Sequence, residues 1–156
     1  MNATSASGPP DSGSPDPREL LNDLCNEMVD LAPEEGWLRI DLMSKMTVPV
    51  QDLSFTVIME DGSSPEVTPT DEFNVILAKL RTAMYQPDPG AWFSARVMIS
   101  PPAKVNYHFN YEFEPEWDPP IEAGCYVEDL EMFPRDPLAM PVWLKDRVHE
   151  AGKEKH

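Results

Sequence analysis

The chain has 156 residues, the size of a single domain. Its 28 aspartates and glutamates outnumber its 12 lysines and arginines, so the formal net charge is −16 and the sequence pI is near 4.3. This charge argues against a nucleic-acid-binding protein, which needs a basic surface, and no apolar run of about 18 residues indicates a membrane span.

The beginning of the chain lacks the pattern of a folded element. Residues 1–15 are rich in serine, glycine and proline, so we expect a disordered leader there, a single domain over 16–152 and a frayed tail at 153–156. The leader has neither the positive nor the apolar region of a secretory signal. We therefore expect a cytoplasmic protein that does not bind membranes.

The first half of the domain predicts a helix, two strands and a second helix. Asp16 to Glu19 is typical of a capped helix start, and Pro33 with Gly36 ends that helix. Apolar and polar residues then alternate with a period of two, which predicts two strands, each with its apolar side chains facing the core. The next helix is predicted after a cap at Thr68 to Asp71. The core-facing residues predicted for these elements are Leu38, Ile40 and Leu42, then Leu53, Phe55, Val57 and Met59, then Phe73, Ile76, Leu77, Leu80 and Met84.

The second half predicts a hairpin followed by two helices. Its strands cover 91–100 and 104–114, and the second alternates between apolar and polar residues along its length. A proline-rich loop over 115–124 precedes short helices at 126–132 and 142–150. The whole order predicts an α+β domain: one antiparallel sheet of about four strands with helices packed on it.

The sequence contains no metal, cofactor or catalytic motif that we can identify. Cys25 and Cys125 lie 100 residues apart without metal-ligand spacing, which favours two buried thiols over one long-range disulfide. A hydrolase is the alternative: Glu112 and Glu114, spaced by two on the predicted strand, would share one face, with His108 nearby. We expect no cofactor and no catalytic residue.

Acidic residues gather over 112–131, where eight acids occur without a lysine or arginine. Such a surface attracts a basic partner, and nearby aromatic side chains such as Trp117 can anchor it. An acidic face that only meets solvent is the other interpretation. The partner-binding residues predicted here are Glu112, Glu114, Glu116, Trp117, Asp118, Glu122, Tyr126 and Asp129.

Three segments, at 110–117, 126–135 and 141–144, carry a resemblance to a known family. Their Asn-Tyr-Glu, Trp, Tyr, Glu-Asp-Leu, Pro-Arg and Pro-x-Trp elements resemble the YezG-like bacterial immunity proteins, of the actinobacterial type. The resemblance implies a small acidic antitoxin that binds and neutralises a polymorphic toxin. Glu112 stands where that family usually has aspartate, and Arg135 of the Pro-Arg step is a candidate internal partner for one of the acids.

Three hypotheses about function follow. The first is a non-enzymatic immunity protein that neutralises a cognate toxin with a basic C-terminal domain. The second is an acidic adaptor without a toxin, and the third is the small hydrolase.

Overall fold

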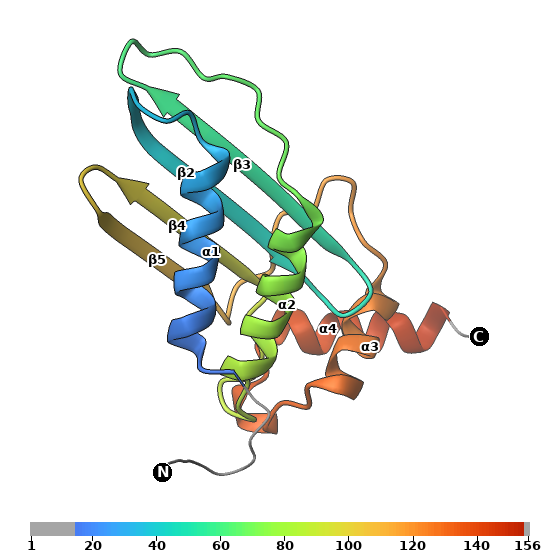
Figure 1. The fold of residues 1–156 in the computed structure, drawn as a ribbon. Coiled ribbons are helices and arrows are strands. Elements are labelled where there is room, and N and C mark those ends of the chain that lie inside the picture. Colours follow the sequence, from blue (N-terminus) through green and yellow to red (C-terminus); the bar gives the residue numbers. More distant parts are fainter. Residues whose placement is uncertain (1–14, 155–156) are drawn as a thin grey trace, which may run out of the picture.

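The structure is a computed structural model that describes residues 15–154, and it forms one α+β domain as predicted (Figure 1). Most of the expected leader and the end of the expected tail lie outside the described residues. The elements in chain order are α1 (Pro17–Leu31), β2 (Trp37–Met46), β3 (Gln51–Met59), α2 (Asp71–Met84), β4 (Ser94–Ser100), β5 (Lys104–Asn110), α3 (Ala123–Met132), the 3₁₀ helix η1 (Pro137–Ala139) and α4 (Val142–Glu154).

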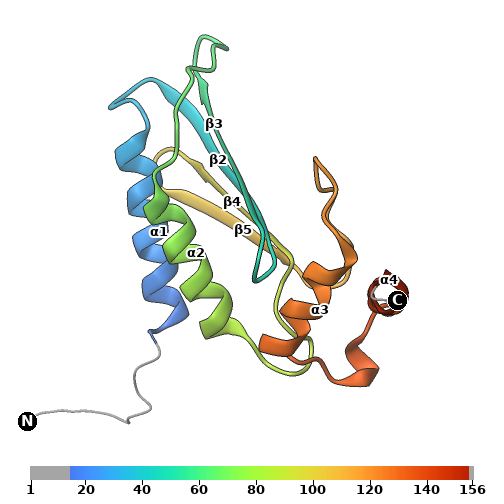
Figure 2. The same ribbon diagram turned by 90° about the vertical axis from the view of Figure 1, so that its right-hand side faces the viewer.

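The four strands form one antiparallel sheet in the order β3-β2-β4-β5. Helices α1 and α2 lie side by side over one face of the sheet (Figures 1 and 2). Helices α3 and α4 pack on each other at one end of the sheet. The expected order and fold class are thus confirmed, whereas α3 and α4 lie at the end of the sheet rather than on one of its faces.

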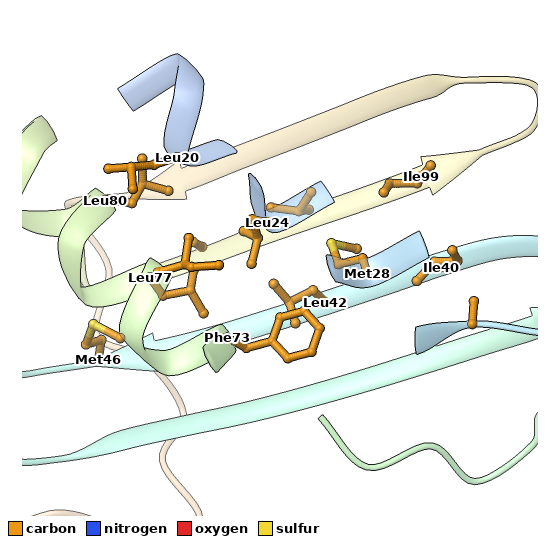
Figure 3. Packing of buried hydrophobic residues seen from close by; sticks show 14 of the residues in the cluster. Leu20, Leu24, Met28, Ile40, Leu42, Met46, Phe73, Leu77, Leu80 and Ile99 are labelled. Carbon is orange, nitrogen blue, oxygen red and sulfur yellow. The ribbon is translucent and has the colours of Figure 1, made fainter. Parts of the chain in front are cut away.

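The main core lies between the sheet and the two N-terminal helices. Figure 3 shows Leu24 and Met28 of α1 and Leu77 of α2 pointing toward Ile40 and Leu42 of β2. Burial of each such side chain stabilises the fold by about 1.5–3 kcal/mol. A smaller cluster, made of Phe93, Tyr126, Leu144 and their neighbours, joins α3 and α4 to the sheet end.

Both predicted helix starts are present, with different capping. The Asp16 carboxylate accepts a hydrogen bond from the Arg18 amide at 2.9 Å, which caps α1 as predicted. Helix α2 begins at Asp71, with Thr70 rather than Thr68 at the N-cap and no side-chain bond from it. Acidic residues in its first turn, Asp71 and Glu72, face the positive end of the helix dipole instead.

The structure corrects the predicted strands at three places, of which the first is the strand predicted over 91–100, since β4 begins only at Ser94. Leu38 was expected in the core, but it is 54% exposed. The pairing of β2 with β3 shifts register between Trp37 and Arg39, and this irregularity turns Leu38 away from the core. β5 ends at Asn110 rather than at residue 114. The Asn110 side-chain oxygen accepts bonds from the amides of Glu112 and Phe113, at 3.2 and 3.0 Å, and this turn stops the strand.

The two cysteines are free thiols, so the disulfide alternative is wrong. Both are half-buried rather than fully buried, and burial raises the pKa of each thiol. Within residues 15–154 no helix is long and apolar enough to cross a membrane. The same described residues contain no group of three or more metal-ligating side chains placed to hold an ion.

Candidate functional site

Helix α3 presents two different sides, and its inner side holds two of the predicted site residues. Tyr126 and Asp129 are spaced by three, so they share one face of the helix, and both are buried. Glu128 and Glu131, also spaced by three, are exposed. The acidic segment is therefore divided into residues that fix the helix and residues that face solvent.

Asp129 forms a buried ion pair with Arg81 of α2. Its two carboxylate oxygens accept from the guanidinium at 2.6 and 2.7 Å, and one also accepts from the Val48 amide at 2.8 Å. Both side chains of the ion pair are at most 3% exposed. Asp129, predicted to contact a partner, is thus buried and paired inside the protein, where its carboxylate neutralises the buried guanidinium of Arg81.

Tyr126 and Glu114 belong to a second internal network. The Trp117 indole N–H donates to the Tyr126 hydroxyl at 2.9 Å, and that hydroxyl donates to Glu114 at 3.1 Å. Arg147 of α4 donates to both Glu114 oxygens, at 2.9 and 3.3 Å. Burial raises the pKa of Tyr126 well above its usual range. These contacts anchor the loop before α3, so three predicted partner residues, Glu114, Trp117 and Tyr126, have structural bonds.

Arg135 also acts inside the molecule, with partners other than those expected. Its guanidinium donates to the backbone carbonyls of Ala91, Tyr111 and Ala139, at 3.1, 2.7 and 3.0 Å. No acid among the described residues forms a salt bridge with it. Burial lowers the pKa of Arg135. The Pro-Arg step therefore joins the loop after β5 to the segment before α4.

The exposed acids border two adjoining hollows beside α3, which we call the acidic groove. Their volumes are about 590 and 360 Å³, and they share Glu122 and Cys125 in their walls. No lysine, arginine or histidine lines either hollow. The groove therefore concentrates negative charge on one surface. Its five acidic lining residues are Asp52, Asp118, Glu122, Glu128 and Glu131.

The groove contains only part of the predicted site. Asp118, Glu122 and Trp117 line it, whereas the exposed Glu112 and Glu116 do not. Asp52 of β3 also lines the groove, although no sequence pattern indicated it, and its Oδ2 lies 3.9 Å from Nζ of Lys45 in a salt bridge.

Two more groove residues, Glu128 and Glu131, were counted in the acidic segment but not assigned to the site. Their three-residue spacing on a predicted helix could have identified them, because residues three apart share a helix face. No local pattern pointed to Asp52, which only the packing of β3 against the loop before α3 brings to the groove.

The geometry expected for the hydrolase is absent. Glu112 and Glu114 lie beyond the end of β5, so they do not share a strand face, and both Glu114 oxygens accept from Arg147. His108 is exposed on β5, where its strand partner is Arg96.

Comparison with known protein families and with curated proteins gives no match for this chain. The resemblance to YezG-like immunity proteins remains an expectation from the sequence motifs alone.

Proposed function

We propose that this protein is a non-enzymatic binding protein that engages a basic protein partner through the acidic groove, and that its partner is a cognate toxin. The observation that carries the proposal is the set of five carboxylates that line the groove, of which only Asp52 forms a salt bridge within the described residues. Such a surface accelerates encounter with a basic domain and discriminates against acidic ones.

The charge of the groove persists because nearby cations are held elsewhere. Arg81 is paired with Asp129, Arg135 donates to backbone carbonyls, and Arg147 is bound to Glu114 and Glu150. None of these three guanidinium groups lines the groove. Lys45 is the exception, because its ammonium forms a salt bridge of 3.9 Å with Asp52. The other four carboxylates of the groove have no salt bridge within the described residues, so they remain available for the lysines and arginines of a partner.

The groove is also built on a firmly held helix. The inner side of α3 is bound through Asp129 and Tyr126, and its outer side carries Glu128 and Glu131. A surface ordered before binding loses less conformational entropy in the complex. An inhibitor needs this property, because it must bind its toxin tightly to protect the cell.

The test is affinity capture from a lysate of the organism that encodes the protein. The wild type is compared with the triple variant Glu122→Gln/Glu128→Gln/Glu131→Gln, which keeps side-chain size and removes three groove charges. The matched control, Glu34→Gln/Glu35→Gln/Glu66→Gln, removes three exposed charges outside the groove. We expect one basic protein to bind to the wild type and the control, to release with added salt, and to escape the groove variant.

Growth then separates an immunity protein from an adaptor. Expression of the captured protein's basic domain should arrest a bacterial host, and co-expression of the wild type should restore growth while the groove variant does not. Equal capture by both triple variants would refute the groove as the binding surface. A captured domain that is harmless to the host would favour the adaptor.

Cys125 offers an independent probe because it lines both hollows of the groove. In a Cys25→Ala background, a bulky maleimide attached to Cys125 should abolish capture of the basic partner. Labelling requires a mildly alkaline buffer, since burial raises the pKa of this thiol. The control is a Glu35→Cys variant without the native cysteines, which carries the same label away from the groove. Undiminished capture by the Cys125-labelled protein would contradict the proposal.

A further inference from the structure

Strand β5 forms an outer edge of the sheet. It pairs with β4 over seven residues, Lys104–Asn110, without any shift of register. On its other side it pairs with no strand within residues 15–154. One row of its backbone donors and acceptors is therefore left for another strand.

The apolar row of β5 extends beyond the cover of the helices. Val105 and Tyr107 lie opposite Ile99 and Val97 of β4, which are buried, yet their own exposed fractions are 38% and 56%. These side chains share the sheet face on which α1 packs, and Figure 1 shows β5 as the outermost strand on that side. An added strand would cover them.

β5 has few of the devices that prevent edge strands from pairing with one another, and Lys104 at its first position is the one present. Inward charges, prolines and bulges protect the edges of most monomeric sheets. β5 contains no acid and no proline, its pairing is regular, and its only formally charged residue is Lys104 at the first position. This absence of acids stands out in a chain with a net charge of −16.

We infer that β5 pairs antiparallel with β5 of a second copy, about a two-fold axis at Tyr107, so that two sheets become one. In this register each Tyr107 faces its equivalent, Val105 faces Phe109 and Asn106 faces His108 of the other copy. Lys104 faces Asn110, so no like charges stand directly opposite. Apolar residues thus meet apolar ones on one face, and polar residues meet polar ones on the other.

The occupant is a second copy rather than the basic partner proposed above. A basic protein would gain no charge attraction from a strand whose only formal charge is positive. The β5 edge and α3 also lie on different sides of the molecule (Figure 1). The inference is independent of the proposed function, and the dimer would leave both acidic grooves open.

The test is the mass of the full chain in solution, measured by sedimentation over a concentration series. We expect the wild type to reach twice the monomer mass of 17.6 kDa. Tyr107→Lys should be monomeric, because it sets two like charges opposite each other at the axis. The control Leu38→Lys, at a similarly exposed site (54%) on β2, should remain dimeric.

Mixing two charged variants makes the test specific for this register. Tyr107→Lys and Tyr107→Glu should each be monomeric alone and should form a mixed dimer when combined, since opposite charges then meet at the axis. Circular dichroism of each variant checks that it is folded. A wild type that stays monomeric at every concentration would overturn the inference, and so would a dimer that survives Tyr107→Lys.

Discussion

At Gly90 the backbone has a φ of +96°, and a Cβ at this position would lie 2.2 Å from Nε of Arg135. The guanidinium of Arg135 is held there by three backbone carbonyls. Glycine is therefore required for two reasons, the left-handed backbone and the close approach of this side chain.

We predict that Gly90→Ala lowers the free energy of unfolding clearly more than Gly62→Ala. Gly62 has a similar φ of +88° but no atom within 4 Å of a Cβ, so alanine there costs only the backbone term of about 1–2 kcal/mol. At Gly90 the displaced Arg135 also loses charged hydrogen bonds, which adds about 1.5–3 kcal/mol. Urea unfolding measures both, and equal losses would contradict this account. In an Arg135→Ala background the two glycine substitutions should cost the same.

We predict that the protein loses stability in alkaline solution, because the buried Tyr126 hydroxyl resists ionisation in the folded state. Burial, and to a lesser extent the Glu114 carboxylate, raise its pKa in the folded state, against the bond donated by Trp117. Because the folded pKa is raised, the protonated Tyr126 hydroxyl contributes fully to the free energy of unfolding below the unfolded pKa of about 10. This contribution is lost as the pH rises further. The free energy of unfolding should therefore fall as the pH rises above about 10, and less steeply for Tyr126→Phe. Part of the pH dependence should remain in Tyr126→Phe, because burial also raises the pKa of Tyr111. If the free energy of unfolding fell equally steeply with pH in the wild type and in Tyr126→Phe, this role of Tyr126 would be refuted.

At the scale of elements, the Arg81–Asp129 ion pair joins the two halves of the fold. Arg81 extends from α2 and Asp129 from α3, and the bond to Val48 adds the turn between β2 and β3. Rings of Trp92, Phe93 and Phe133 surround the guanidinium at 5.0–6.0 Å from its central carbon. The ion pair thus replaces apolar packing where α3 meets the sheet.

We predict that Asp129→Asn costs about 3–5 kcal/mol of unfolding free energy, because the Arg81 charge then stays buried without its counter-charge. The double variant Arg81→Met/Asp129→Leu should lose less, since it leaves no unpaired charge in the interior. Glu150→Gln, which removes an exposed partner of Arg147, serves as the control and should cost less than about 1 kcal/mol. Denaturant unfolding decides. A loss for Asp129→Asn as small as that of the control would show that the ion pair does not hold α3.

Local patterns predicted the elements well where tertiary contacts reinforced them. The stripe of Phe73, Ile76, Leu77 and Leu80 identified α2, because helical spacing and burial agree there. The end of β5 was missed because alternation continues to residue 114 in the sequence, while the Asn110 side chain closes a turn. A side-chain hydrogen bond to the backbone overrides a hydrophobic pattern without altering it.

At the scale of the whole molecule, the net charge of −16 opposes the compact state. We predict that added salt raises the Tm, because it screens repulsion among the exposed acids. The triple variant Glu122→Gln/Glu128→Gln/Glu131→Gln should gain less from salt than the wild type, since these carboxylates border one groove. Thermal unfolding at low and high salt measures this difference, with the Glu34/Glu35/Glu66 variant as control. A larger salt effect in the groove variant than in the wild type would contradict the prediction.

The sequence by itself determined the order of elements and the single α+β domain, because helical and strand periodicities are local properties. It also indicated an acidic C-terminal segment. Only the tertiary structure decided which acids are available, because Asp129 and Glu114 meet cations that are 48 and 33 residues away in the chain. It likewise brought Asp52 to the groove and left β5 uncovered at the sheet edge. The acidic surface is therefore made only of those acids that folding leaves exposed, because the buried ones are paired with cations.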